Sequence, residues 1–152
     1  LRWPNDIVFD GRKLGGILCE SATAGCVPEL AVVGIGVNMN HGPEDFPSDI
    51  RGAATSIRAA LGRPADRAGF LDALLAAFDC RLDSLSRGDL DGLVRAFNDL
   101  SALRPGDPVL VSTDGPARGF FYKGIGPDGA LLLRDPAGVL RRFLSADVRK
   151  VL

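Results

Sequence analysis

The sequence has 152 residues, of which 46% are hydrophobic and 24% are charged. These proportions are typical of a globular protein with a real core, and the length allows one ordinary domain or two small ones. Eighteen basic and nineteen acidic residues give a net charge of −1, which offers no basic footprint for a nucleic-acid backbone or an anionic membrane. We therefore expect neither nucleic acid nor membrane as a partner.

Three cysteines, Cys19, Cys26 and Cys80, are odd in number and lack CxxC spacing. They predict neither a disulfide framework nor a zinc site, and they fit a reducing, cytoplasmic setting. The longest apolar runs, such as 29–39, are shorter than the ~20 residues that cross a bilayer, and no secretory signal heads the chain. Met39 is the only methionine. We therefore expect this chain to be the C-terminal portion of a longer protein.

The first forty residues predict strands. Apolar segments at 7–9 and 14–19 flank Asp10-Gly11, a dipeptide that favours a type I′ hairpin turn. The segment 30–37 is nearly all apolar, as expected of a strand that is buried on both faces. From residue 38 to residue 48 glycine and proline break any periodicity, so this stretch predicts a loop.

Helices are predicted over 55–61, 66–85 and 90–100. In the second and third of these, apolar residues recur at spacings of three and four, which is typical of amphipathic helices. Both stripes are expected to be core: Leu71, Leu74, Phe78, Leu82 and Leu85 in one helix, and Leu90, Leu93, Val94, Phe97 and Leu100 in the next. The segment Ser86-Arg87-Gly88-Asp89 resembles an N-capping box for the third helix.

The helical pattern stops near Leu103, and short alternating segments separated by glycine-containing turns follow. These segments are 109–111, 117–122, 130–133 and 139–143. They predict a small antiparallel barrel. We therefore expect an α+β protein with domains at 1–102 and 103–152.

The register of the first hairpin decides whether two charged residues meet. A two-residue Asp10-Gly11 turn would pair Val8 with Lys13 and Asp6 with Gly15, so that Asp6 and Lys13 become diagonal neighbours on one face. A three-residue turn would direct Lys13 to the other face. The charged pair is therefore an expectation that depends on the turn.

Two consecutive glycines, Gly15 and Gly16, weaken a strand unless a ligand or another backbone must approach closely. A fixed lysine, Lys13, beside a bare backbone suits a phosphate or carboxylate ligand, because it supplies charge beside exposed N–H groups. The alternative is a surface ion pair between Lys13 and Asp6 that contributes at most ~1 kcal/mol.

Three words of sequence occur in order: Arg2-Trp3-Pro4-Asn5-Asp6, Lys13-Leu14-Gly15-Gly16-Ile17-Leu18 and Val33-Gly34-Ile35-Gly36-Val37-Asn38. They resemble the Lys/Arg-Trp-Pro-Asn-Asp, Lys-Leu-x-Gly-Ile-Leu and Val-Gly-x-Gly-x-Asn words of biotin protein ligases. The last fifty residues resemble the SH3-like C-terminal domain of that family. The resemblance covers essentially the whole chain. It implies part of a class II synthetase-like biotin/lipoate ligase catalytic domain, with a mixed sheet and helices, followed by an SH3-like β-barrel.

The resemblance also implies an enzyme and its reaction. Biotin and Mg-ATP would form biotinyl-5′-adenylate, and a lysine of a biotin carboxyl carrier protein domain would then attack the activated carbonyl. Lys13 is the implied central residue, in contact with the biotin carboxylate and the α-phosphate, and Gly15 and Gly16 complete the implied biotin site. No metal is expected other than the Mg²⁺ that accompanies ATP.

Further residues follow from the same matching words. Asn5, Asp6 and Asn38 are implied to bind the ATP or adenylate, and Asp6 is also placed to orient or deprotonate the incoming amine. Thr55-Ser56 resembles a family word near the adenine pocket, although these hydroxyls could equally cap a helix. His41, the only histidine, is expected to be exposed.

Trp3 and Pro4 more often fix the start of a strand than contact substrate. The Arg-rich glycine loop that covers biotin in the family is not in this sequence, so the isolated chain is expected to be inactive. Two alternatives stay open: a ligase-like binding protein without turnover, and a lipoate or octanoate transferase. Some members of the family form homodimers through sheet edges.

Overall fold

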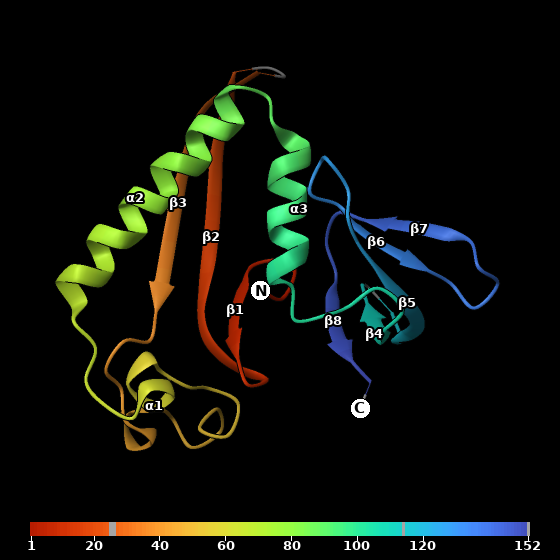
Figure 1. Ribbon diagram of the computed structural model, residues 1–152. Helices are drawn as coiled ribbons and strands as arrows, with labels where there is room; N and C mark the ends of the chain where they lie inside the picture. The colour runs from red at the N-terminus through yellow and green to blue at the C-terminus, as the bar shows by residue number, and fades with distance from the viewer. Residues whose placement is uncertain (25–26, 114, 152) are drawn as a thin grey trace. The chain divides into compact units, whose positions relative to one another are not determined.

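The computed structural model describes residues 1–24, 27–113 and 115–151, so Cys26 and Asp114 lie outside the described residues (Figure 1). The chain forms two compact units, one of residues 5–71 and one of residues 1–4 together with 72–152. Within the described ranges, no helix is both long enough and apolar enough to cross a membrane. Each unit is built around its own antiparallel sheet.

The unit of residues 5–71 contains a three-stranded sheet of order β1-β2-β3. Strand β1 is Asp6–Phe9, β2 is Arg12–Ala24 and β3 is Val27–Val37, and Figure 1 shows β2 and β3 as one long hairpin. Both long strands exceed the predicted segments, because their antiparallel pairing continues as far as Ala24 and Val27. The prediction that β3 is buried on both faces is wrong: Leu30 is 59% exposed and Val32 is 55% exposed. An apolar strand is buried only where another element covers its face.

The turn between β1 and β2 has the predicted two-residue form. Residues 10 and 11 both have positive φ, at 49° and 71°, which is the type I′ geometry. Val8 therefore pairs with Lys13 as expected, but the register then shifts and Asp6 pairs with Gly16 instead of Gly15. The predicted Asp6–Gly15 pair is wrong because β2 carries a β-bulge at this point.

The rest of this unit consists of short helices and loops. A 3₁₀ turn, Pro43–Asp45, lies in the predicted loop, and the short helix α1 is Ile57–Leu61. Ser56 is the N-cap of α1, and its Oγ accepts a hydrogen bond of 3.1 Å from the backbone N–H of Ala59. The helix therefore begins two residues after its predicted start, and the capping interpretation is confirmed for Ser56.

Two longer helices occur as predicted: α2 is Arg67–Ser86 and α3 is Leu90–Leu100. The predicted Ser86-to-Asp89 capping box is wrong, because Ser86 ends α2 and Asp89 itself caps α3 by accepting a hydrogen bond from Gly92 N. The core prediction also fails for much of both stripes. No residue of either helix is fully buried, and Leu71, Leu85 and Leu100 are 52%, 53% and 65% exposed. Periodicity identifies an apolar face but not the element that covers it.

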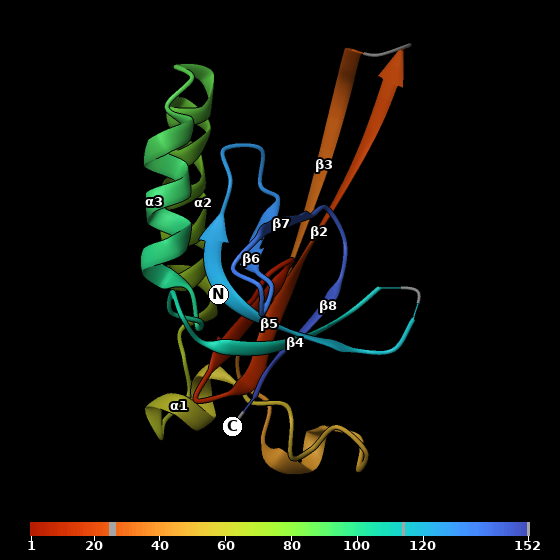
Figure 2. The ribbon, with the colours of Figure 1, turned by 90° about the vertical axis from the view of Figure 1, so that its right-hand side faces the viewer.

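The C-terminal sheet has five antiparallel strands in the order β7-β6-β5-β4-β8. These strands are Pro108–Ser112 (β4), Arg118–Ile125 (β5), Leu131–Arg134 (β6), Leu140–Phe143 (β7) and Asp147–Lys150 (β8). Figure 2 shows β5 bending along its length, and the register of the β5–β6 pair shifts between Tyr122 and Gly124. The sequence did not predict β8, because Val148 is its only apolar residue.

One core cluster fills this sheet: Trp3, Leu103, Val109, Val111, Tyr122, Leu131, Leu133 and Val148. Alternate residues of β4 and β6 point inward, as the two-residue period of a strand requires. Helix α3 is tied to the sheet at its C-terminal end, where the hydroxyls of Ser101 and Tyr122 lie 3.1 Å apart in a buried hydrogen bond. Burial raises the pKa of the Tyr122 hydroxyl despite this bond, so Tyr122 is a neutral partner.

Candidate functional site

The two charged residues of the first hairpin form the predicted pair. Lys13 Nζ lies 2.6 Å from Asp6 Oδ1, and the side chains are 51% and 18% exposed, respectively. The β-bulge changes the backbone register but still leaves both side chains able to meet. The result is a largely buried carboxylate that holds one end of a half-exposed ammonium group.

The two glycines beside this pair differ in what their missing side chains would touch. A Cβ on Gly15 would lie 2.2 Å from the carbonyl oxygen of Gly36, so β3 itself makes the close approach at this position. A Cβ on Gly16 would meet only ordinary contacts, at 3.6 Å from Lys13 Cε and 3.7 Å from Lys13 Nζ. Gly15 is therefore explained by backbone packing, whereas Gly16 leaves space beside the ammonium group.

A second segment of chain closes around the start of β2. The backbone N–H of Lys13 donates to Ala53 O at 2.7 Å, and the N–H of Thr55 donates to Lys13 O at 2.8 Å. These bonds form a parallel bridge between Lys13 and Ala54, which adds parallel pairing to an otherwise antiparallel sheet. The backbone N–H of Asn38 also donates to Leu14 O at 2.8 Å. The sequence therefore brings Lys13, Asn38 and Thr55 together from three separate segments.

Asn38 and Thr55 present polar groups at this junction. Asn38 Nδ2 donates to the carbonyl oxygen of Thr55 at 3.0 Å. The side-chain oxygen of Asn38 takes no part in this bond and can accept another hydrogen bond. Thr55 is only 2% exposed, and within the part of the chain that the structure describes its hydroxyl has no hydrogen-bond partner. A buried hydroxyl without a partner is uncommon in folded proteins. From the sequence alone, either Thr55 or Ser56 could have capped the helix; the structure assigns the cap to Ser56.

The remaining candidates lie at the margins of this group. Asn5 is exposed, and its backbone oxygen accepts a 2.8 Å hydrogen bond from Ile17 N, so it is fixed at the start of β1. His41 is exposed as predicted, with its ring centroid 5.6 Å from that of Phe46. Ser56 Oγ donates to His41 O at 2.6 Å. In residues 1–24, 27–113 and 115–151, no three His, Cys, Asp or Glu side chains cluster closely enough to hold a metal ion.

This arrangement can bind an anion next to a neutral polar group. The ammonium of Lys13 has three protons, and Asp6 occupies one direction, so the remaining N–H groups can donate to a phosphate or carboxylate. Asn38 adds an amide oxygen from a neighbouring segment, whereas the Thr55 hydroxyl is buried beneath this surface. A ligand that combines an anionic group with a hydrogen-bond donor would suit Lys13 and Asn38 together.

Comparison with known proteins identifies similar sequences. The model of the biotin/lipoate A/B protein ligase family matches residues 1–38, which include Asp6, Lys13 and Asn38. The bifunctional ligase/repressor BirA of Bacillus subtilis (strain 168) is 33% identical over 154 residues, covering 97% of this chain and 45% of that protein. The biotin–[acetyl-CoA-carboxylase] ligase of Paracoccus denitrificans is 33% identical over 144 residues, covering 91% and 58%. The chain thus spans about half the length of these relatives.

Solved structures with the same fold superpose on nearly the whole of this chain. The apo biotin protein ligase from Aquifex aeolicus superposes with a TM-score of 0.82 at 24% identity, covering 99% of this chain and 65% of that one. The same enzyme in complex with biotin and ATP gives a TM-score of 0.81 and covers 99% and 62%. This likeness confirms the predicted α+β architecture over both the three-stranded sheet and the five-stranded C-terminal sheet.

Proposed function

We propose that this chain is a member of the biotin/lipoate A/B protein ligase family and the C-terminal portion of an enzyme that joins biotin to a carrier protein. The observation that carries the proposal is the 2.6 Å contact between Lys13 Nζ and Asp6 Oδ1, within the residues that the family model matches. The substrates would be biotin and ATP, and the acceptor would be a lysine of a biotin carboxyl carrier domain.

Lys13 has the central role in this proposal. The biotin carboxylate would attack the α-phosphorus of ATP and displace pyrophosphate, and negative charge would build on the oxygens between the two substrates. Lys13, held on one side by Asp6, would donate to these oxygens and stabilise the charge. Gly16 would let the ligand approach the ammonium, and Gly15 would contribute through the backbone of the strand.

The other polar residues would bind the nucleotide and orient the acceptor. Asn38 would accept a hydrogen bond through its side-chain oxygen, and Asn5 would contact the adenylate at the start of β1. Asp6 would orient or deprotonate the carrier amine in the second step.

Mg²⁺ fits this proposal as a companion of ATP rather than as a resident metal. Within the described ranges no cluster of three carboxylate, imidazole or thiol side chains lies close enough to hold it. Mg²⁺ is commonly bound through substrate phosphates with only one or two protein carboxylates. The protein residues would then act on the substrates directly.

The division into 1–102 and 103–152 stays a prediction. We propose that the second part docks the carrier or closes over the site, because no ion pair beside a strand glycine like that of Lys13 and Asp6 is found among its described residues. A cytoplasmic location is part of the same proposal, and the free, exposed thiols of Cys19 and Cys80 fit it. The isolated 152-residue chain is proposed to be inactive.

The experiment compares Lys13→Ala with Lys150→Ala in the full-length ligase. Lys150 forms a matched ion pair, 2.7 Å from Asp107, with exposures of 45% and 20% that resemble those of Lys13 and Asp6. Both changes should cost at most ~1 kcal/mol of stability because both ion pairs are partly exposed. Only Lys13→Ala should slow biotin-dependent pyrophosphate release, by about 10²–10³-fold.

Single-turnover adenylate formation, measured with radiolabelled ATP, gives the rate directly. Circular dichroism of both variants checks that the fold is retained. If Lys13→Ala forms adenylate as fast as the unmodified enzyme, Lys13 belongs to a surface ion pair and the proposed role is wrong. An equal loss of rate in Lys150→Ala would likewise remove the distinction on which the proposal rests.

A further inference from the structure

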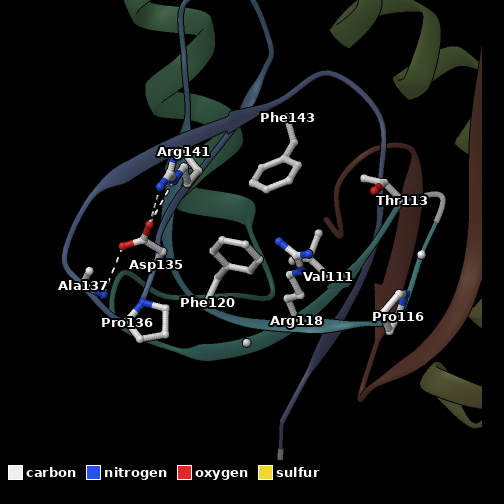
Figure 3. A pocket seen from close by; sticks show the side chains of 12 residues that line it. Val111, Thr113, Pro116, Arg118, Phe120, Asp135, Pro136, Ala137, Arg141 and Phe143 are labelled. Carbon is white, nitrogen blue, oxygen red and sulfur yellow. Dashed lines mark hydrogen bonds and ion pairs between the residues drawn. The ribbon is translucent and has the colours of Figure 1, made fainter.

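A groove of about 910 Å³ lies on the five-stranded sheet, apart from the residues of the proposed ligase site. Figure 3 shows it from close by. Its floor contains Phe120 and Phe143, whose rings meet edge to face with centroids 5.4 Å apart, and the buried Val111 lies beside them. Pro116 and Pro136 stand at opposite sides of the groove. An extended peptide can bind in a groove of this kind, with apolar side chains packed on the aromatic floor.

Two arginines flank the aromatic floor, but they differ in their partners. Arg141 binds Asp135 through Nε and Nη2, both at 2.9 Å from Oδ2, and Asp135 also accepts hydrogen bonds from the backbone N–H groups of Ala137 and Val139. Arg118 has neither an ion pair nor a side-chain hydrogen bond within the described residues. Figure 3 shows its guanidinium group near Phe120. One cation in the groove is therefore available to a ligand.

The charges of the whole C-terminal region favour an acidic ligand. Residues 103–152 contain eight basic residues and five acidic residues, all five of them aspartates. Residues 1–102 contain ten basic residues and fourteen acidic residues. Each of the four described aspartates of this region is already paired with a cation: Asp107 with Lys150, Asp128 with Arg142, Asp135 with Arg141 and Asp147 with Arg149. The excess positive charge is thus left on residues such as Arg118.

We propose that this groove binds an extended, acidic peptide segment of a partner protein. A carboxylate of the peptide would pair with Arg118, and a neighbouring apolar side chain would pack on Phe120 and Phe143. The charge complementarity and the apolar floor carry this assignment. The inference does not depend on the proposed ligase reaction, because it uses none of the residues of that site.

The groove suits a peptide better than a small molecule or a nucleic acid. Arg118, Pro116 and Pro136 are exposed, so the groove is shallow, whereas small-molecule sites bury most of the ligand surface. A nucleic-acid backbone is bound by several cations in a row. Here Arg118 is the one arginine or lysine among the described lining residues that lacks a carboxylate partner.

The test uses a fluorescent heptapeptide in which glutamate alternates with leucine, titrated into the protein at low salt and followed by anisotropy. Matched peptides carry glutamine or lysine in place of glutamate. Arg118→Glu should weaken binding of the glutamate peptide by roughly tenfold, because an exposed attraction becomes a repulsion. Lys123→Glu is the matched control, since Lys123 is exposed on the same strand, lacks a carboxylate partner within the described ranges and does not line the groove.

The expected result is binding that requires glutamate, weakens with salt and is lost selectively in Arg118→Glu. Amide chemical shifts should then change at Phe120 and Phe143. Equal binding of the glutamine peptide, or an equal loss in Lys123→Glu, would overturn the proposal. Tighter binding of a single-stranded oligonucleotide, or of free glutamate, would assign the groove to another ligand class and overturn it as well.

Discussion

The indole Nε1 of Trp3 donates a hydrogen bond of 3.0 Å to the carbonyl oxygen of Gly129, a residue 126 positions later. Trp3 is only 7% exposed and lies in the core cluster of the five-stranded sheet. Trp3 therefore holds the segment just before Asn5 and Asp6 in the core that the C-terminal region provides. Deleting residues 103–152 would expose this indole, so such a deletion cannot test the role of the barrel alone.

Substitution of Trp3 should destabilise the unit that contains the C-terminal sheet. Trp3→Ala leaves a cavity and should lower the free energy of unfolding by about 3–5 kcal/mol. Trp3→Phe keeps an apolar ring but removes the hydrogen bond, and should cost about 1–2 kcal/mol. Urea denaturation measures both values. Phe9→Ala, at a side chain that is 48% exposed, is the control and should cost much less; an equal cost would contradict the anchoring role of Trp3.

The sequence predicted best where a local pattern decides the structure. The periodicity of 66–85 and 90–100 gave both long helices within a residue of their observed ends, and Asp10-Gly11 gave the turn that brings Lys13 to Asp6. Long-range packing was not predictable. Nothing local indicates that Trp3 lies in the C-terminal core, or that most leucines of α2 are exposed.

The candidate site shows the same limit. The pairing of Lys13 with Asp6 could be expected from hairpin parity, but the β-bulge that shifts Asp6 to Gly16 could not. The bridge between Lys13 and Ala54 joins segments more than forty residues apart, so neither strand pattern indicates it. The role of Gly15 could not be predicted from the sequence. A glycine in a strand is expected both where a ligand approaches and where another backbone approaches, and only the structure shows that the backbone of β3 does so here.

The two adjacent glycines provide a paired test of these roles. Gly15→Ala should destabilise the protein by several kcal/mol, since its Cβ would lie 2.2 Å from a backbone oxygen that cannot move without disturbing β3. Gly16→Ala should fold normally, because its Cβ meets only contacts of 3.6 Å or more. It should nevertheless weaken biotin binding in the full-length ligase, because the methyl group lies beside Lys13 Nζ.

Thermal unfolding and calorimetric titration with biotin separate the two glycine effects. The expected pattern is a large loss of stability in Gly15→Ala and a loss of affinity without loss of stability in Gly16→Ala. Normal stability in Gly15→Ala would show that β3 yields to the added methyl group. Unchanged affinity in Gly16→Ala would place the ligand elsewhere.

Asp107 should contribute to the acid sensitivity of the C-terminal unit. Its pKa is lowered from the ordinary value of 3.8, first by the hydrogen bond from Lys150 and then by that from the backbone N–H of Arg104. A lowered pKa in the folded state means that the stabilisation is present above pH 3.8 and is lost as the pH falls through the folded-state pKa. NMR titration of the Asp107 carboxyl should give a higher pKa in Lys150→Ala. An unchanged pKa in that variant would show that Arg104 alone causes the shift.

Asn38 and Asn40 provide a matched pair that separates folding from nucleotide binding. Each side-chain Nδ2 donates to a backbone carbonyl at 3.0 Å, Asn38 to Thr55 and Asn40 to Ala65. Replacing either residue by aspartate removes the donor and places a negative oxygen against the carbonyl, so each change should cost about 1–3 kcal/mol of stability. Only Asn38→Asp should also weaken ATP binding in the full-length ligase, since Asn38 is the member of the pair that we propose to bind the nucleotide. Urea denaturation and calorimetric titration with ATP give the two readouts, and equal ATP affinities in the two variants would remove Asn38 from the nucleotide site.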